Sequence, residues 1–416
     1  MQEFAAIEKF FKDNLESYLE ILHQMVDINS FTANPDGVNR LSSYTAELFA
    51  RLGFQAEFVQ SVNPGFGKHL VLTRLGQTTP AGKPGSLIGM VSHLDTVFPP
   101  EEERLHDFVW RPSGKRIYGP GTVDIKGGTV MMYMVLDAMR RFEPQRFEQG
   151  TWILLLDASE ETLSVDFAAL CRERLPANTL ACLIFEGGTN ASESFPVVIA
   201  RKGRAAYRVT VEGKSAHAGN YHANGANAIL QISHTIQKIA ALTDYEKQIT
   251  FNVGTVSGGS VVNRVPHSAR ADVEMRAFDP AVFEAGVAAM LALDGTSEVV
   301  SADGYRCKVK IELTDRTVPW PVNPDTQKIY EIWESVGQLV GLPVSTEQRG
   351  GLSDGNMLWD RYPTLDGLGP AGNNAHCSER SADGSKDQEF VLVGSFAPKA
   401  LLNTLAIMKL LEGASV

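Results

Sequence analysis

The chain has 416 residues, 44 % of them hydrophobic and 21 % charged, which is the composition of a folded globular protein and excludes a disordered or fibrous one. Its formal net charge of −11 disfavours nucleic acid and anionic membranes as partners, because phosphate groups attract a basic surface. A chain of this length exceeds what one compact core accommodates, so we expect more than one domain.

Cysteine use and the N-terminal segment bear on the location of the protein. The four cysteines show no CxxC spacing, which argues against a disulfide framework and a thiolate zinc site and is typical of a reducing cytoplasm. The N-terminal segment mixes acidic with apolar side chains, unlike a secretory signal. No apolar run approaches the roughly 18 residues that a membrane-spanning helix needs. We therefore expect a cytoplasmic protein without a membrane partner.

The first part of the chain alternates between predicted helices and predicted buried strands. Apolar residues at steps of three and four over 4–22 predict an amphipathic helix. Further helices are predicted over 41–52 and 126–142. Short apolar runs predict strands at 69–75, 87–92, 152–156 and 181–185. This alternation is typical of an α/β sheet that is covered on both faces.

A different order of elements follows from about residue 203. The predicted order is strand, helix, strand, strand, helix, strand, which is the ferredoxin-like arrangement, over 206–212, 227–242, 249–256, 269–278, 281–293 and 307–314. From residue 325 the α/β pattern resumes and ends in a helix over 395–411. We therefore predict an α/β domain in two pieces, 1–203 and 317–416, with an inserted domain at 204–316.

The first candidate for chemistry is a histidine and an aspartate at the end of a predicted strand. His93 follows the apolar run 87–91, and ligands of α/β sheets bind at the carboxyl ends of strands. Asp95, two residues on, can fix the tautomer of a metal-bound imidazole. A loop histidine beside an unrelated carboxylate is the alternative, and this pair alone does not decide between them.

A glycine-rich turn supplies the second candidate. Residues 119–128 hold Asp124 between several glycines and a proline, which specify an unusual backbone path just before a helix. The spacing fits neither of the common phosphate-binding glycine patterns. Asp124 either caps the following helix or is held rigidly enough to bridge two metal ions.

Carboxylates follow two further strands, and a second histidine lies late in the chain. Glu160 and Glu161 come after an apolar strand, where they are either a solvated helix start or a metal ligand beside a carboxylate that faces a metal-bound water. Glu186 follows the next strand, and His376 lies in a polar loop. Nitrogen and oxygen ligands without thiolates suit a catalytic divalent ion. Taken together, these residues favour a site with two metal ions.

These motifs, in this order, resemble the co-catalytic zinc exopeptidase family. That family includes carboxypeptidase G-type glutamate carboxypeptidases, aminoacylases, acetylornithine deacetylases and succinyl-diaminopimelate desuccinylases. The segment 214–219 in the inserted domain is similar to the family's lid signature, and 350–356 and 363–370 are similar to the stretch before its last ligand. The resemblance covers nearly the whole chain and implies a mixed-sheet catalytic domain with a ferredoxin-like lid and dimerisation domain.

The resemblance also implies a role for each matching residue in the catalytic domain. His93 and Glu186 would hold one metal ion, Glu161 and His376 the other, with Asp124 bridging both. Asp95 would orient His93, and Glu160 would be the general base. The implied cofactors are two Zn²⁺ per subunit, with Co²⁺ or Mn²⁺ as alternatives.

The inserted domain is expected to contribute to substrate binding. By the resemblance, His217 would help to stabilise the oxyanion, acting in its own or a partner subunit, and Asn263 and Arg276 would hold polar groups and the carboxylate of the substrate, with Gly351 nearby. Arg316 is a further candidate for the carboxylate. A homodimer through the inserted domain is also expected.

Three functions are compatible with these features. The first is hydrolysis of an amide bond to a C-terminal amino acid, with glutamate as first choice and a peptide or N-acyl amino acid as substrate. The second is an acetylornithine or succinyl-diaminopimelate type of deacylase, and the third is an inactive binding protein. Two positions depart from the family pattern: Ser159 replaces the usual Asp, and Cys377, a possible stray nucleophile, follows the last histidine.

Overall fold

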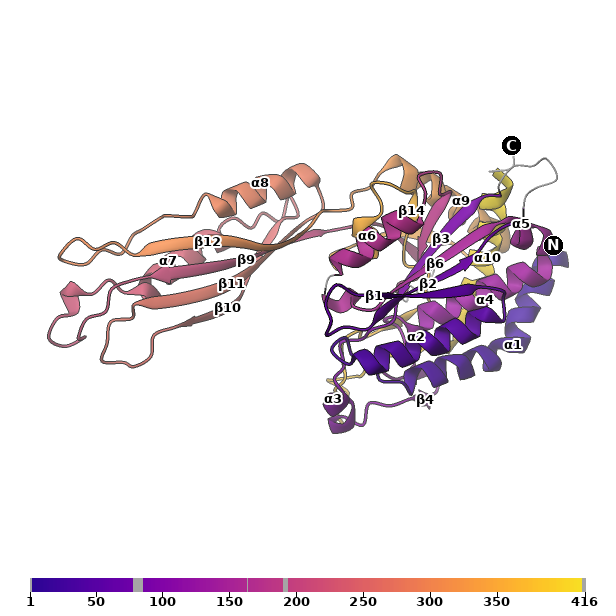
Figure 1. Cartoon of the computed structure of the whole chain (residues 1–416), viewed down its shortest axis with the longest axis horizontal. Helices are drawn as coiled ribbons and strands as arrows, with labels where there is room; N and C mark the ends of the chain where they lie inside the picture. The colour runs from indigo at the N-terminus through magenta and orange to yellow at the C-terminus, as the bar shows by residue number, and fades with distance from the viewer. Residues whose placement is uncertain (1, 78–84, 163, 190–193, 414–416) are drawn as a thin grey trace. The chain divides into compact units, whose positions relative to one another are not determined.

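The structure is a computed structural model that describes residues 2–77, 85–162, 164–189 and 194–413 (Figure 1). The chain forms two compact units. The first unit comprises Met1–Ile199, Val322–Glu347 and Ser353–Val416, and the second comprises Ala200–Pro321 and Gln348–Leu352. The insertion expected at 204–316 lies inside the second unit, which extends a few residues further at each end and includes a short later segment.

A six-stranded mixed sheet forms the centre of the first unit. Its strands, in spatial order, are β1 (Gln55–Gln60), β2 (Lys68–Arg74), β6 (Thr151–Asp157), β3 (Leu87–His93), β7 (Ala181–Ile184) and β14 (Thr364–Leu365). The pairs β1–β2 and β2–β6 are antiparallel, and the remaining neighbours are parallel. The carboxyl ends of β6, β3 and β7 therefore lie along one edge of the sheet.

Both faces of the central strands β6, β3 and β7 are buried, which explains the continuous apolar runs in the sequence. Alternate residues of β6 point to opposite faces. Leu154 and Leu156 belong to the larger core, whereas Ile153 and Leu155 pack with Phe167 on the other side. The larger core contains side chains of α1 (Gln2–Val26), α2 (Pro35–Ala50), α4 (Lys126–Phe142), α9 (Pro324–Val340) and α10 (Phe396–Gly413), together with Phe147 from a short helix. The opposite face packs against α6 (Val165–Arg174).

The long elements of the first unit confirm the sequence predictions, and the main difference lies at the start of α2. This helix begins at Pro35 rather than near residue 41, because the side chain of Asn34 caps its N-terminus by accepting the N–H of Gly37. Besides β1, β14 and α6, the elements without a sequence prediction include α3 (Pro100–Leu105), β4 (Arg111–Ser113), β5 (Arg116–Tyr118), α5 (Pro144–Gln149), β8 (Phe195–Arg201), β13 (Val344–Arg349), β15 (Gly372–Asn373) and β16 (Phe390–Leu392).

The second unit is an antiparallel four-stranded sheet with two helices, as the ferredoxin-like prediction requires (Figure 1). The strands β9 (Gly203–Glu212), β10 (Thr250–Gly258), β11 (Ser268–Ala277) and β12 (Lys308–Thr317) are ordered β10-β11-β9-β12. Burial alternates along β9, which is typical of a sheet with one covered face. That face packs against α7 (Ala228–Ala240) and α8 (Pro280–Leu291). Within the described residues, neither unit contains a helix with the length and apolar character needed to span a bilayer.

Candidate metal centre and active site

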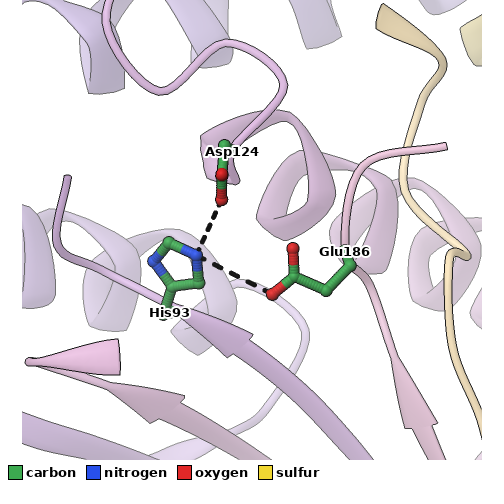
Figure 2. Close-up of side chains that lie close together, drawn as sticks. All are labelled: His93, Asp124 and Glu186. Atoms are coloured by element: carbon green, nitrogen blue, oxygen red, sulfur yellow. Dashed lines mark hydrogen bonds and ion pairs between the residues drawn. The ribbon is translucent and has the colours of Figure 1, made fainter. Parts of the chain in front are cut away.

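Two strand ends and the glycine-rich turn bring three potential metal ligands together. His93 is the last residue of β3 and is buried, Glu186 follows β7, and Asp124 lies just before α4 (Figure 2). The Nε2 atom of His93 is 3.0 Å from Oδ1 of Asp124 and 3.8 Å from Oε1 of Glu186. These three side chains offer one nitrogen and two carboxylate groups to a common point.

A second group of three potential ligands shares the same aspartate. The Nε2 atom of His376 is 3.3 Å from Oδ2 of Asp124 and 3.1 Å from Oε2 of Glu161. Each carboxylate oxygen of Asp124 therefore faces a different histidine. This arrangement makes Asp124 the common member of both groups, as a bridging ligand must be.

The position of Asp124 depends on a buried glutamate that sequence reasoning missed. The Oε1 atom of Glu389 accepts the backbone N–H groups of Val123, at 2.9 Å, and of Asp124, at 3.2 Å. Glu389 directly precedes β16, which pairs with β5 just before the glycine-rich turn. Asp124 itself does not cap α4, because Ile125 is the N-cap residue and makes no side-chain cap. A single glutamate before a short strand gives no motif from which this role could be predicted.

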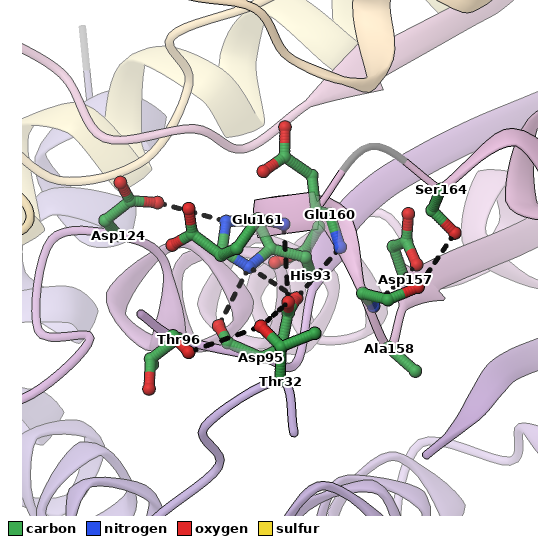
Figure 3. Close-up of polar contacts among 12 residues, drawn as sticks. Thr32, His93, Asp95, Thr96, Asp124, Asp157, Ala158, Glu160, Glu161 and Ser164 are labelled. Atoms are coloured by element: carbon green, nitrogen blue, oxygen red, sulfur yellow. Dashed lines mark hydrogen bonds and ion pairs between the residues drawn. The ribbon is translucent and has the colours of Figure 1, made fainter. Parts of the chain in front are cut away.

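Asp95 has a wider role than orienting His93. The Nδ1 atom of His93 is 3.0 Å from the backbone oxygen of Asp95 and 3.4 Å from its Oδ1. The carboxylate of Asp95 also accepts the backbone N–H groups of Glu160, at 3.1 Å, and Glu161, at 3.3 Å (Figure 3). The hydroxyl of Thr32 donates to its Oδ2 at 2.6 Å. Asp95 thus fixes both the first histidine and the turn that carries the two glutamates.

Burial and mutual repulsion dominate the electrostatics of the site. Burial, together with the nearby Glu186 and Asp354, raises the pKa of Glu160 well above its ordinary value. Burial would also raise the pKa of Asp124, but its hydrogen bonds with His376 and His93 outweigh this effect and lower it. Hydrogen bonds to Asp124 and Glu161 raise the pKa of His376 to about 11. So many carboxyl groups in one buried place fit a centre that is neutralised by divalent cations.

The chemistry of the donor set also fits a metal centre. Both groups of three consist of imidazole nitrogen and carboxylate oxygen, which suit Zn²⁺, Mn²⁺ or Co²⁺ in a catalytic site. Cys377, next to His376, is exposed, and its backbone N–H donates to the carbonyl oxygen of Asn374. Ser159 is buried and bonds through its hydroxyl to Ser164. Neither departure from the family pattern removes a potential ligand.

The second unit brings His217 and Asn263 together on neighbouring segments. The backbone N–H of Ala218 donates to the carbonyl oxygen of Asn263, and both named side chains are exposed. The Nδ1 atom of His217 accepts the backbone N–H groups of Gly219 and Asn220, each at 3.1 Å. An imidazole that accepts at Nδ1 carries its proton at Nε2 when neutral, so His217 presents a hydrogen-bond donor at the end of its ring.

The two candidate arginines of the second unit have different surroundings. Arg276, on β11, donates to both carboxylate oxygens of Glu274, at 2.7 and 3.2 Å, and to the carbonyl oxygen of Gly350 at 2.7 Å. It is thereby placed beside the segment that contains Gly351. Arg316, on β12, pairs with Glu284 of α8 and lies over the ring of Phe283. Its guanidinium group is therefore held against that helix.

Comparisons with known proteins agree with this architecture. Residues 199–292 match the family described as "Peptidase dimerisation domain". The chain is 23 % identical over 366 residues to carboxypeptidase G2 of a Pseudomonas species, covering 88 % of this chain and 84 % of that protein. It is 26 % identical over 273 residues to acetylornithine deacetylase of Photorhabdus laumondii, covering 60 % of this chain and 65 % of that protein.

Solved structures confirm the fold. A tripeptidase from Staphylococcus aureus has a TM-score of 0.75 at 21 % identity, over 96 % of this chain and 99 % of that one. An M20 family metallo-carboxypeptidase from Sulfolobus solfataricus has a TM-score of 0.66 at 15 % identity, over 95 % and 99 %. The domain match and the sequence relatives indicate a hydrolytic enzyme that acts on peptide or amide bonds. Residues 199–292 thus match the dimerisation domain of peptidases, and the chain as a whole shares the fold of the M20 family metallo-carboxypeptidase.

Proposed function

We propose that the protein is a hydrolase with two metal ions that cleaves the amide bond to a C-terminal amino acid. The observation that carries this proposal is the division of the Asp124 carboxylate between His93 and His376. One ion would be held by His93, Asp124 and Glu186, and the other by Asp124, Glu161 and His376. Zn²⁺ is the first choice for both ions, with Co²⁺ or Mn²⁺ as alternatives.

Glu160 is proposed as the general base. Bound cations would supply polarisation of the scissile carbonyl and a lowered pKa for the attacking water. Glu160 would accept a proton from that water and deliver it to the leaving amine nitrogen. His217, in the same or a partner subunit, would donate from Nε2 to the developing oxyanion.

The substrate we favour has a free α-carboxylate, with glutamate as the released amino acid. Within the described residues, Arg276 uses three N–H groups on Glu274 and Gly350, and a guanidinium group has five to offer. The others would bind the carboxylate, with Asn263 and the Gly351 backbone holding the remaining polar groups. Arg316 is the weaker candidate for the carboxylate, since its guanidinium group is held against α8 by Glu284 rather than beside the segment that contains Gly351. The similarity to carboxypeptidase G2 supports this choice.

A deacylase acting on N-acyl amino acids is the second candidate. Several acetylornithine deacetylases are among the relatives, at 25 to 28 % identity over about 60 % of the chain. Both reactions place an amide bond next to a free carboxylate, so the same centre can serve either. The difference lies in the side chain and acyl group that the enzyme accepts.

One experiment tests the proposed activity and its alternative. The purified protein is analysed for metal by mass spectrometry and assayed against acyl-glutamates, acetylornithine, succinyl-diaminopimelate and dipeptides, with and without chelator. We expect about two metal ions per chain and the highest kcat/KM on an acyl-glutamate, lost on chelation and restored by Zn²⁺. A preference for acetylornithine would favour the deacylase. A protein that binds no metal at micromolar Zn²⁺ and cleaves no substrate would contradict both.

We also propose a cytoplasmic homodimer formed through the second unit. Strand β10 lies at the edge of its sheet, and exposed apolar side chains gather on it and on nearby segments, including Ile229, Leu230, Val256, Val261 and Val262. A second copy of the chain could bury these side chains across a two-fold axis. The match to a dimerisation domain supports this assembly. The cytoplasmic location is predicted from the spacing of the four cysteines in the sequence.

A further inference from the structure

A buried histidine outside the metal centre lies directly behind the Glu160–Glu161 turn. His69, near the start of β2, is 1 % exposed, and its ring lies 5.3 Å from the ring of Phe167, measured between centroids. Because β2 and β6 are antiparallel neighbours, His69 lies beside the carboxyl end of β6. The chain leaves β6 at Asp157 and enters the turn three residues later.

One nitrogen of this ring faces the turn. The Nδ1 atom of His69 is 3.1 Å from both Oδ1 of Asp157 and the backbone nitrogen of Ala158. When the ring is neutral with its proton at Nε2, Nδ1 accepts the N–H of Ala158. When the ring is charged, Nδ1 donates to Asp157. In either state, Nδ1 is bound to the segment that leads into Glu160.

The other nitrogen faces away from the metal centre, towards α6. The Nε2 atom of His69 is 3.0 Å from Oδ2 of Asp166. Burial would raise the pKa of Asp166, but hydrogen bonds from His69 and from the backbone of Val62 outweigh it and lower the pKa to about 2. Asp166 is thus a charged anchor for the far end of the ring.

The segment between the two aspartates closes the arrangement. The backbone N–H of Ser159 donates to Oδ1 of Asp157 at 2.9 Å, and its hydroxyl donates to Ser164 at 3.0 Å. Ser164 in turn donates to Oδ1 of Asp166 at 3.2 Å. Figure 3 shows Asp157 and Ser164 on the side of Glu160 away from Asp124. An ionised aspartate at position 159 would have no hydroxyl to donate to Ser164. It could therefore not replace Ser159 in this chain of hydrogen bonds.

We propose that His69 is a positioning residue, which holds the segment from Asp157 to Glu161 so that the Glu160 carboxylate has one fixed location. Asp95 binds the backbone of this turn from one side, and His69 binds its beginning from the other. Because the imidazole ring is rigid and both of its nitrogens are bonded, it holds a fixed distance between α6 and the turn. This inference rests on the proposed role of Glu160 as general base.

Two substitutions of His69 test the contacts of its two ring nitrogens separately. Asparagine places a polar atom near the position of Nδ1 and loses the contact with Asp166, whereas glutamine reaches the position of Nε2 and loses the contact with the turn. We expect His69→Gln to lower kcat by about 10²-fold with KM little changed, since small misplacements of a catalytic group can have effects of this size. We expect His69→Asn to keep most of the kcat. Tm is measured for both, and metal content must stay at the wild-type level.

Hydrogen exchange gives a readout that does not depend on activity. In His69→Gln, the amides of 157–162 should exchange faster than in His69→Asn, with residues 151–156 of β6 unchanged in both. If His69→Gln does not fold, Asp157→Asn, which keeps the shape of the side chain but weakens the Nδ1 contact, should show the same changes at smaller size.

Equal kcat values in the two His69 variants, or losses that follow Tm alone, would overturn the inference. Equal exchange rates over 157–162 would overturn it even if the wild-type protein cleaved none of the substrates. In that event the failure of the proposed function would be recognised separately, by the inactive wild-type enzyme.

Discussion

The two units of the molecule handle charge in different ways. In the first unit, Asp95, Asp124 and Glu161 are largely buried at strand ends and turns. Their carboxylates contact histidine rings or backbone N–H groups. In the second unit, charged side chains form pairs on the surface, such as Lys308 with Glu212. Residues 204–316 contain equal numbers of acidic and basic residues, so the net negative charge lies in the rest of the chain.

This difference shows where stability and chemistry are coupled. Buried carboxyl groups with raised pKa values destabilise the fold unless they are neutralised. The stability of the first unit should therefore depend on binding of the proposed metal ions. Exposed pairs contribute little to stability, and the second unit instead has a conventional apolar core of its own. The second unit can therefore tolerate changes on its surface, which is the part proposed to meet substrate and partner.

The largest effect is expected at Glu160, where the first unit should lose chemistry but not metal. Glu160→Gln should lower kcat by about 10³-fold, within the range typical of a lost general base, while about two metal ions remain per chain. Glu161→Gln is the matched comparison, because its carboxylate contacts His376 and its loss should reduce metal content. Steady-state kinetics and metal analysis of both variants test this. Near-normal turnover in Glu160→Gln would refute the assignment.

A smaller loss is expected at His217, and it would show that the second unit also takes part in the chemistry. His217→Ala should lower kcat by about 10²-fold, as removal of an oxyanion donor does, with metal content and Tm unchanged. His222→Ala, a nearby substitution in the same unit, is the control. Unchanged kcat in His217→Ala would restrict the active site to the first unit.

Removal of metal should distinguish the units by stability. A ligand present at about 100 times its dissociation constant stabilises the folded state by about 2.7 kcal/mol, so chelation should lower the Tm of the first unit measurably. The second unit should be unaffected, because both groups of potential ligands lie in the first. Calorimetry with and without chelator, with hydrogen exchange to assign each transition, measures this. A shift confined to the second unit would reverse the comparison.

The smallest effect on the single chain is expected on the exposed apolar surface of the second unit. Val262 is fully exposed, and Val262→Asp should shift the protein from dimer to monomer in sedimentation experiments. The Tm of the resulting monomer should match that of the wild-type monomer at high dilution. Leu75→Asp, at an exposed position of the first unit, should leave the dimer intact. A wild-type protein that is already monomeric would contradict the proposed assembly.

Much of the fold could be predicted because long buried elements have strong periodicity. The helix over 126–142 and the strand at 87–92 match α4 and β3 closely, since burial on one or both faces leaves a clear pattern. The strand β1 could not be predicted, because most of its side chains are exposed and give no alternation. Strands of two or three residues, such as β14, depend on neighbours distant in sequence.

The candidate metal ligands could be predicted from the sequence, but the residues that hold them in place could not. His93, Asp124 and Glu161 lie in recognisable motifs, and the structure brings them together. Glu389 and His69 lie in no motif, and their roles come from contacts across more than 80 residues of sequence. A single sequence shows which side chains are present. Burial and contacts between distant segments determine which of them position the candidate ligands.

The shared carboxylate of Asp124 has a consequence for how the centre fills. Since each of its oxygens faces a different histidine, an ion that orients Asp124 at one position also sets the oxygen for the other. In the proposed centre, occupancy of the two positions would then be linked, and by thermodynamic reciprocity each ion would alter the affinity for the other by the same factor. If the linkage is favourable, titration with a divalent cation would populate empty and fully loaded chains at the expense of chains that hold a single ion.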